Sequence, residues 1–245
     1  MTLLPAWFYN EWQQIGVDFE DTAQVEAFDR NQKSSSPEAE RSLIQRLGIS
    51  KGHTVIDLGA GTGTFAIQAA IAGAYVYAVD VSPVMLDYAR QKACNANAFN
   101  IEFYHNGFLT YEHNAEPADF IVTKSALHHL PDFWKMVALL RIASMLKNEG
   151  ILYLRDVIFS FNPAVYQSHI EDWIERVAKP PGEGFTKLDF EMHVREKHST
   201  FAWIVEGMLQ RAGFKIVEAD YLTPESAQYV CKKVPVESPS NQPIS

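Results

Sequence analysis

Short apolar runs alternate with amphipathic stretches through the middle of the chain. Each run is short enough for a strand, and the runs begin near Thr54, Ala74, Ile101, Phe120 and Gly150. The stretches between them have helical periodicity over residues 64–72, 83–95 and 131–147. Because such alternation is typical of a parallel sheet, the pattern predicts a Rossmann-like, doubly wound α/β fold.

The pattern changes near the end of the chain. A helix is predicted near Thr200–Ala212, and two further strands follow at Lys215–Tyr221 and Ala227–Lys233. Only residues 222–226 join these strands, which is too short for the crossover that parallel neighbours need. We therefore expect a mostly parallel seven-stranded sheet with an antiparallel last strand.

Residues 1–50 have helical periodicity and predict an N-terminal cap. Serines at 34–36 interrupt it, and its three helices are expected near Pro5–Ile15, Thr22–Gln32 and Pro37–Leu47. The first of these helices carries an aromatic stripe formed by Trp7, Phe8, Tyr9 and Trp12. The stripe either closes an apolar substrate chamber as a mobile lid or packs the cap onto the core.

Composition narrows the class of protein. A chain of 245 residues that is 47% hydrophobic can bury one large core. The net charge of −9 and the lack of a Lys/Arg tract argue against a nucleic-acid partner. Cys94 and Cys231 have neither metal spacing nor a disulfide framework. No apolar run is long enough to span a membrane and the start lacks a signal-peptide pattern, so a cytoplasmic location is expected.

The run VIDLGAGTGTFA, Val55–Ala66, reads as a strand, a glycine turn and a helix. Glycines let the backbone turn sharply near a ligand, and the helix start offers free N–H groups and a positive dipole. The next apolar run ends at Asp80, and an acid about 20 residues after such glycines can accept both hydroxyls of a ribose. Asp80 alone could simply end a strand. Together, these features predict a cofactor that contains a ribose.

The glycine spacing separates classes of cofactor. A dinucleotide fingerprint needs a glycine at the sixth position counted from Gly59, and that position is Thr64. The chain has D-x-G-x-G-x-G instead, with Asp57 two residues before the first glycine. A carboxylate there would repel a pyrophosphate but pair with a cation. The pattern favours a sulfonium or ammonium ligand over a phosphate.

These residues resemble the class I S-adenosylmethionine-dependent methyltransferases. The similarity rests on VIDLGAGTG, on AVDVS at Ala78–Ser82 and on ADFIVTKSALHHLPD at Ala118–Asp132. It implies the Rossmann-like fold, S-adenosyl-L-methionine as cofactor and S-adenosyl-L-homocysteine as product. In the family, the glycine loop surrounds the methionine part, the acid after the second strand holds the ribose, and the segment after the third strand frames the adenine.

The resemblance carries these roles to particular positions. Where the family often has an aspartate facing the adenine amino group, this chain has Asn106, whose side-chain oxygen could still accept that hydrogen bond. Met85 is favoured as a core residue, although it could touch the ribose or adenine. The expected cofactor-binding residues are Asp57, Gly59, Ala60, Gly61, Gly63, Asp80, Val81, Met85, Asn106, Gly107, Phe108 and Lys124.

The patterns and the resemblance together divide the chain. Residues 1–50 form the helical N-terminal cap or lid, and residues 51–245 form the methyltransferase domain. Within that domain we expect a cofactor-binding core at 51–156, a substrate-side insertion at 157–199, a final helix and strand pair at 200–234 and a tail at 235–245. The insertion has a helix at 163–178 and a break at 179–184. Family members differ in their caps and in this insertion, so specificity is expected there.

His128 and His129 follow the fourth strand and are the candidate catalytic residues. One imidazole could orient the acceptor or take its proton. Alternatively, the pair caps the next helix or fills space under the cofactor. Methyl transfer from a sulfonium needs little acid–base help, because the leaving group departs neutral and alignment supplies most of the acceleration.

Other charged residues form a weaker set of candidates. Further pocket candidates are Asp156, His169, Glu171 and Asp172. No spacing among them forces a metal site, and we predict no metal. His193 and His198 flank Arg195, Glu196 and Lys197, and this segment is predicted to be a solvated charged face.

The absence of two motifs narrows the chemical class of the methyl acceptor. The Asn/Asp-Pro-Pro-aromatic loop of amino-modifying DNA and glutamine methyltransferases is absent, since the place reads Lys124-Ser125-Ala126-Leu127. Neither cysteine follows a proline, as a cytosine-C5 enzyme requires. A small or medium organic acceptor remains, attacked through O, N, C or S. The alternatives are a non-catalytic S-adenosylmethionine-binding protein and, less favoured, a nicotinamide-dependent oxidoreductase.

Overall fold

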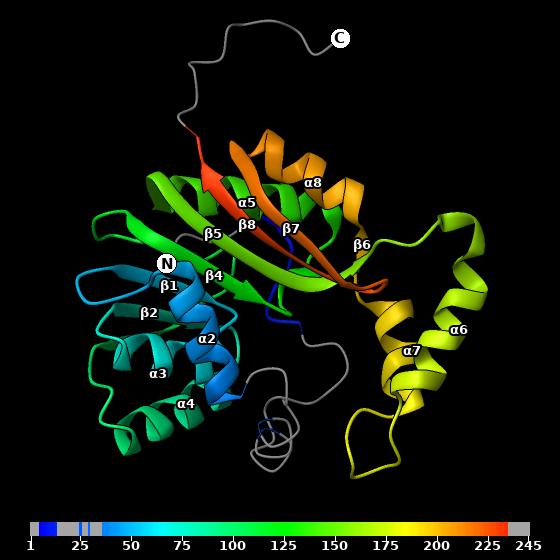
Figure 1. Cartoon of the computed structure of the whole chain (residues 1–245), viewed down its shortest axis with the longest axis horizontal. Coiled ribbons are helices and arrows are strands. Elements are labelled where there is room, and N and C mark those ends of the chain that lie inside the picture. The colour runs from blue at the N-terminus through cyan, green and yellow to red at the C-terminus, as the bar shows by residue number, and fades with distance from the viewer. Residues whose placement is uncertain (1–4, 14–24, 26–28, 30–35, 235–245) are drawn as a thin grey trace, which may run out of the picture.

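An open mixed sheet lies at the centre of the molecule, and the computed structural model describes residues 5–13, 25, 29 and 36–234 (Figure 1). The strand order is β3-β2-β1-β4-β5-β8-β7, and the two-residue β6 (Thr200–Phe201) pairs with β5 off this path. The strands are β1 (Thr54–Leu58), β2 (Tyr75–Asp80), β3 (Ile101–His105), β4 (Ala118–Lys124), β5 (Leu146–Phe159), β7 (Phe214–Thr223) and β8 (Ser226–Lys233).

The strand directions confirm the predicted fold class. Every neighbouring pair from β3 to β5 is parallel, whereas β8 is antiparallel to both β5 and β7. The sheet therefore has one reversed strand, inserted between β5 and β7. The loop between β7 and β8 is short, so these two strands form a hairpin, as the spacing predicts.

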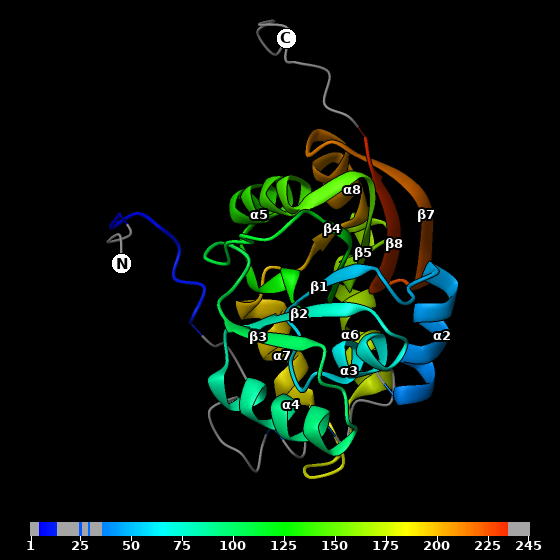
Figure 2. The same ribbon diagram turned by 90° about the vertical axis from the view of Figure 1, so that its left-hand side faces the viewer.

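Helices cover both faces of the sheet (Figures 1 and 2). On one face, α2 (Pro37–Leu47), α3 (Thr64–Ile71) and α4 (Pro83–Asn95) contribute to a buried apolar cluster that includes Val55 of β1. On the other, α5 (Asp132–Met145) and α8 (Ala202–Arg211) pack in a cluster with Ile56 of β1. Successive residues of β1 thus serve opposite cores, as a strand buried on both faces requires.

Local capping explains why two helices begin and end where the sequence predicts. Ser36 accepts a hydrogen bond from the Ala39 N–H at 3.3 Å, and α2 ends at Gly48 in the left-handed conformation. Ser82 caps α4 in the same way, accepting from the Met85 N–H at 3.1 Å. The bounds of α2 and α4 match the predicted ranges 37–47 and 83–95.

The segment after β5 forms a helical lobe at one side of the sheet (Figure 1). β5 continues as far as Phe159, beyond the expected core boundary at Asp156. The lobe contains the short helix η3 (Pro163–Val165), α6 (Tyr166–Val177) and α7 (Lys187–Glu196). Its own apolar cluster centres on Phe159, Trp173 and Ile174. The sequence did not predict α7, which begins at a capping box between Thr186 and Asp189.

The first predicted helix is wrong. Residues 5–13 form turns rather than a helix, and the rest of Pro5–Ile15 lies outside the described residues. The rings of Trp7, Phe8 and Tyr9 all lie near Trp134 of α5, with centroids 6.3, 5.0 and 6.2 Å away. Consecutive residues on a helix point about 100° apart, so three successive rings could not share one partner. Most of Thr22–Gln32 also lies outside the described residues, and the division into cap, core and insertion stays a prediction.

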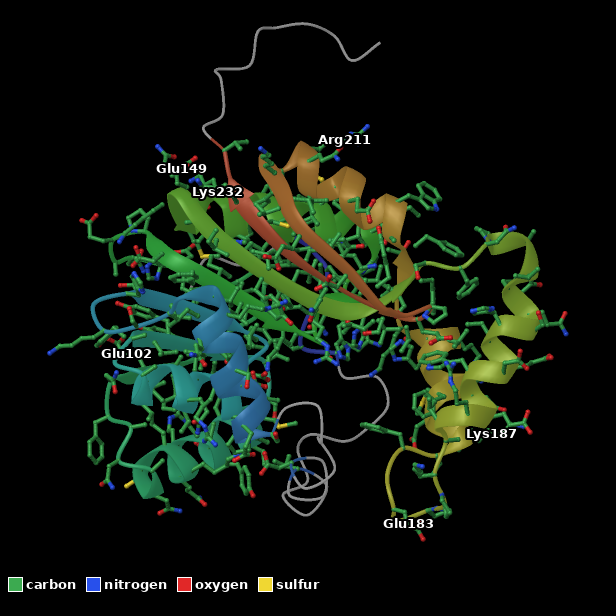
Figure 3. The ribbon with its side chains drawn as sticks, in the orientation of Figure 1. Glu102, Glu149, Glu183, Lys187, Arg211 and Lys232 are labelled. Atoms are coloured by element: carbon green, nitrogen blue, oxygen red, sulfur yellow. The ribbon has the colours of Figure 1, made fainter. Side chains whose placement is uncertain are left out.

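The charged side chains labelled in Figure 3 point outward from the sheet, from α8 and from the helical lobe. Lys232 pairs with Glu149 on the sheet, and Glu183 and Lys187 lie at the tip of the helical lobe. Exposed pairs of this kind contribute little to stability. No helix within the described ranges is long and apolar enough to cross a membrane, and a cytoplasmic location stays a prediction.

Two adjacent leucines of α5 test which face carries the core. Leu139 is fully buried, whereas Leu140 is half exposed. We expect Leu139→Ala to lower the free energy of unfolding by about 2–5 kcal/mol, because it leaves a cavity. Leu140→Ala should change it by at most about 0.5 kcal/mol. Urea unfolding followed by circular dichroism measures both, and equal losses would contradict this packing.

Candidate active site

The candidate site lies at the carboxyl ends of the parallel strands. The strand order reverses at β1, which lies between β2 and β4. In open α/β sheets, ligands bind beyond the strand ends at such a reversal. The loops after β1, β2, β3 and β4 meet there, and residues 5–13 run along the same region between α5 and β3 (Figure 2).

Asp80, the last residue of β2, is held by the backbone on both carboxylate oxygens. Oδ2 accepts from the Gly61 N–H at 2.8 Å, and Oδ1 accepts from the Ser82 N–H at 2.9 Å. Burial raises the pKa of Asp80, although these N–H groups oppose the shift. Because a carboxylate oxygen can accept more than one hydrogen bond, both oxygens retain capacity for two hydroxyls.

The loop after β1 is fixed against the end of β2. The N–H groups of Gly59 and Ala60 donate to the carbonyl of Val79 at 2.9 and 3.0 Å. Gly63 has φ +76° and begins α3 without a side-chain cap. A Cβ at Gly63 would overlap that of Ala89 in α4, so the close approach of α3 and α4 also requires glycine.

Asp57 is a buried carboxylate at the carboxyl half of β1. Burial raises its pKa to about 7, although the Lys124 ammonium and the Ala66 N–H lower it. Oδ2 has no hydrogen-bond partner. A positive group next to this oxygen would favour the ionised form. Asp57 is therefore suited to a cationic ligand.

Lys124 ends β4 and turns towards α2. Its ammonium forms a hydrogen-bonded ion pair with the buried carboxylate of Glu40. The same ammonium lies 5.3 Å from the ring centroid of Phe65 in α3. A cavity of about 220 Å³ next to α2 is lined by both members of this pair and by Arg155. Positive charge thus lies beside the acids at this end of the sheet.

The segment after β3 packs tightly. The Asn106 N–H donates to the Asp80 carbonyl at 3.1 Å, which ties this segment to the end of β2. The Gly107 N–H donates to Thr110 Oγ1 at 3.1 Å. Phe108 is buried in the core, and its carbonyl accepts from Arg141 Nε at 3.1 Å. Asn106, the first of the three expected adenine-framing residues, therefore lies beside Asp80.

Val81 and Met85 lie at the start of α4. The Val81 carbonyl is 2.8 Å from His105 Nε2. Met85 is buried, which fits the packing role favoured from the sequence. The structure brings the expected cofactor-binding residues to one end of the sheet, while their roles towards a ligand stay a prediction.

His128 and Asp156 form a buried pair. His128 Nδ1 lies 2.5 Å from Asp156 Oδ1, and the His128 N–H donates to Asp156 Oδ2 at 3.0 Å. Burial alone would raise the pKa of Asp156, but the charge of His128 and hydrogen bonds from His128 and Val157 lower it. Asp156 is thus ionised, and its carboxylate accepts the hydrogen bond from Nδ1 of His128. The other ring nitrogen, Nε2, is buried and has no hydrogen-bond partner.

His129 has a different environment from its neighbour. Burial, followed by the charges of His128 and nearby groups, lowers its pKa well below the ordinary value. Its backbone carbonyl accepts a hydrogen bond from the Tyr9 hydroxyl at 3.0 Å. The pair of candidate catalytic residues is therefore not interchangeable, because only His128 has a carboxylate partner in the described residues.

The expectation of a solvated charged face at 193–198 is wrong for His193. The His193 ring lies 4.9 Å from the His128 ring, and burial followed by the charge of His128 lowers its pKa to about 3. The His198 N–H donates to the His128 carbonyl at 2.8 Å. Arg195 and Glu196 are exposed and pair with each other, as the expectation requires. The unpredicted helix α7 brings His193 onto the His128–Asp156 pair.

Buried polar atoms without partners cluster at this end of the sheet. Within the ranges that the structure describes, the four such side-chain atoms are Asp57 Oδ2, Thr123 Oγ1, His128 Nε2 and Glu11 Oε1. Buried polar groups in folded proteins normally have hydrogen-bond partners. Their concentration on β1, β4 and the adjoining segments indicates a polar ligand at this place. No group of three metal-ligating side chains is present among the described residues.

Sequence reasoning missed two buried acids. Glu40 lies in a helix predicted to be amphipathic and Glu11 in the aromatic N-terminal segment, and nothing in their spacing marks them as buried. Asp156 was a candidate, but its pairing with His128 joins residues 28 positions apart and needs the register of β4 and β5. The contact of Glu11 with the Leu109 N–H and that of Glu40 with Lys124 likewise depend on tertiary structure.

Comparisons with known proteins agree with this geometry. Residues 55–150 match a family model described as a methyltransferase domain. A relative from Geobacillus kaustophilus, named as an uncharacterised methyltransferase, is 24% identical over 199 residues, covering 76% of this chain and 90% of the relative. The methyltransferase YrrT of Bacillus subtilis is 28% identical over 174 residues, covering 71% of this chain and 75% of YrrT.

Solved structures share the fold. An S-adenosylmethionine-dependent methyltransferase from Aquifex aeolicus has a TM-score of 0.61 at 19% identity, covering 87% of this chain and 99% of that one. Magnesium protoporphyrin IX methyltransferase from Synechocystis, with bound S-adenosylhomocysteine, has a TM-score of 0.61 at 18% identity, covering 91% of each chain. Residues 55–150 are thus a methyltransferase domain, and the chain is similar in sequence and fold to the class I S-adenosylmethionine-dependent methyltransferases. The resemblance seen in its glycine loop is thereby confirmed.

The raised pKa of Asp57 in this methyltransferase predicts a pH-dependent stability. Because the folded pKa of about 7 exceeds the ordinary 3.8, this group favours folding below about pH 4 and loses that contribution as pH rises to about 7. We expect the stability of Asp57→Asn, relative to the unmodified chain, to increase across this range. Urea unfolding between pH 4 and pH 8 measures the difference.

Asp119 provides the control with the opposite sign. A hydrogen bond from Lys147 helps to lower its pKa despite partial burial, so its carboxylate stabilises the fold above about pH 4. Asp119→Asn should therefore lose stability relative to the unmodified chain as pH rises to about 4, and the difference should stay constant from there to pH 8. A stability difference for Asp57→Asn that is independent of pH would contradict the assignment of a buried, protonatable carboxyl.

Proposed function

We propose that this methyltransferase transfers the methyl group of S-adenosylmethionine to a small or medium organic acceptor, with His128 taking the acceptor's proton. The observation that carries the proposal is the buried His128–Asp156 pair beside the carboxyl end of β4, with Nε2 unpartnered. When bound, the cofactor supplies an electrophilic methyl group on a sulfonium. The chain's own residues bind, orient and take the proton.

The acids at the strand ends suit the charge and shape of the cofactor. Asp57 offers a buried carboxylate oxygen to a cationic group, and Asp80 offers two oxygens to the ribose hydroxyls. The backbone of 106–108 lies beside Asp80 and frames the base. A pyrophosphate would meet two carboxylates instead of free N–H groups, which disfavours the oxidoreductase alternative.

His128 is built to accept a proton in one orientation. Asp156 holds the Nδ1 proton, so the Nε2 lone pair is available for the acceptor's O–H, N–H or S–H group. The charge of Asp156 also stabilises the imidazolium that forms. This arrangement favours an acceptor whose attacking atom carries a proton and supports catalysis over the non-catalytic binding alternative.

The helical lobe controls access to this imidazole. His193 of α7 covers His128, and the cavity that borders His128, Asp156 and Lys135 has only about 10 Å³ of volume. That is about the space of one water molecule. An acceptor reaches Nε2 when α6 and α7 move away from the sheet. The lobe therefore selects the acceptor and excludes water when it closes.

The first test replaces the proposed base. A panel of small hydroxyl, amine and thiol acceptors with radiolabelled S-adenosylmethionine identifies a substrate. With that substrate, we expect His128→Asn to lower kcat by about 10²–10⁴-fold, because proton removal is lost. The dissociation constant of S-adenosylhomocysteine should stay unchanged. His53→Asn, at the opposite end of β1, is the matched control and should keep full activity.

Either of two results would count against this proposal. Full activity of His128→Asn would remove the imidazole from the reaction. Binding of S-adenosylhomocysteine without methyl transfer to any of the panel would favour the non-catalytic alternative.

The second test addresses the ribose acid. We expect Asp80→Ala to weaken binding of S-adenosylhomocysteine by about 1–3 kcal/mol, because the ribose hydroxyls lose their acceptors. Isothermal titration calorimetry measures the affinity, and the thermal midpoint checks that the variant is folded. Unchanged affinity in a folded Asp80→Ala variant would refute the role of Asp80.

A further inference from the structure

Glu11 is a buried carboxylate with one oxygen unused. Its exposure is 8%, and Oε2 accepts from the Leu109 N–H at 2.9 Å. Oε1 is buried and has no partner. Leaving a carboxylate oxygen dry and unpaired is costly unless something else binds it. The mechanism above does not use this group.

Gly107 leaves the space that the carboxylate occupies. A Cβ built on Gly107 would lie within 3.0 Å of both oxygens and the carboxyl carbon of Glu11. Gly107 is not among the residues with positive φ, so its backbone conformation suits any residue. The need for space, and not for flexibility, therefore explains the glycine. The N-terminal segment supplies a carboxylate where this loop has no side chain of its own.

Aromatic contacts on both sides hold Glu11 in place. Before it, Phe8 packs against Trp134 of α5 at 5.0 Å between centroids. After it, the ring of Trp12 lies 5.0 Å from that of His105, the last residue of β3. The segment is thus anchored to two elements that border the site, and Glu11 lies between the anchors.

The position of Glu11 relates it to the base of the cofactor. Asp80, the proposed ribose acid, pairs in register with His105, and the Asn106 N–H donates to the Asp80 carbonyl. Gly107 follows Asn106 directly, so it lies close to the proposed ribose site. This step rests on the proposed function, in which residues 106–108 frame the base. The 6-amino group is the donor on the adenine ring, and an ionised carboxylate can only accept.

We propose that Glu11 accepts a hydrogen bond from the 6-amino group of the cofactor's adenine and makes binding selective for a 6-amino over a 6-oxo purine. A 6-oxo group would place an acceptor against an acceptor and leave both buried without a partner. Binding of the base and seating of residues 5–13 are then coupled, because the same carboxylate joins them.

The test compares two ligands that differ at this one group. S-adenosylhomocysteine carries the 6-amino group, and S-inosylhomocysteine carries a 6-oxo group in its place. Calorimetric titration of the full chain should show a preference of roughly 10–100-fold for the amino ligand. Glu11→Ala should abolish most of that preference. Glu11→Gln should also reduce it, because an amide can present a donor or an acceptor. Glu112→Ala, an exposed acid nearby, should keep the full preference.

A double variant separates the carboxylate from the seating of the segment. In Glu11→Ala/Gly107→Asp, the vacated space receives a carboxylate from the loop itself, and we expect the preference for the amino ligand to return. Gly107→Asp alone should weaken binding, because two acids then compete for one place. Thermal midpoints check folding of each variant.

The outcomes distinguish this inference from the proposed function. A preference that survives Glu11→Ala overturns the role of Glu11, as does failure of the double variant to restore a lost preference. If the unmodified chain binds neither ligand, the cofactor site itself has been assigned wrongly and both proposals fall. Binding with a Glu11-dependent preference supports both.

Discussion

The burial of Asp57 is the constraint on which the rest of the site depends. Its carboxyl group lies at the carboxyl half of a central strand, where burial raises its pKa to about 7 and leaves one oxygen unpaired. The nearby Lys124 does not neutralise it fully, because Lys124 is already paired with Glu40. Such an arrangement is costly in the folded chain alone and becomes favourable when a cation binds. A phosphate at this place would add a second negative charge and increase the cost of burying the carboxylate.

Two further buried groups follow the same logic on either side of Asp57. On one side, Asp156 stays ionised because His128 is next to it. The same contact uses Nδ1 of His128 and leaves its buried Nε2 without a partner. On the other, Glu11 is held by the backbone N–H of Leu109 and keeps an unpaired oxygen against Gly107. The fold thus supports unpaired groups that differ in chemistry: two acceptors for donors or cations, and one base.

The sequence predicts the parts of this site that are local. The glycine turn, Asp57 and Asp80 belong to one strand–turn–helix–strand unit, so their spacing alone indicates the cofactor class. Helices α2 and α4 were also predictable, since Ser36–Pro37 and Ser82–Pro83 mark their starts. Each apolar run is short enough to be a strand. Because these runs alternate with helical stretches, the parallel order of the sheet was also predictable.

What the sequence did not predict depends on tertiary contacts. The aromatic stripe at 7–9 and 12 was predicted to lie on a helix, but the three consecutive rings at 7–9 all lie near Trp134, which turns allow and a helix does not. His193 appears among charged residues, yet α7 packs it against His128. Glu11 and Gly107 are 96 positions apart, and neither is informative until the chain folds.

The most direct test of the account is the number of protons exchanged when the full chain binds S-adenosylmethionine at pH 7. Titration calorimetry in two buffers of different ionisation enthalpy measures it. The account predicts binding with net release of protons, because a partly protonated Asp57 ionises when the cation arrives, and this release should disappear in Asp57→Asn. Binding with no proton exchange, or no binding at all, would contradict the claim that a buried carboxyl at this position receives the cofactor.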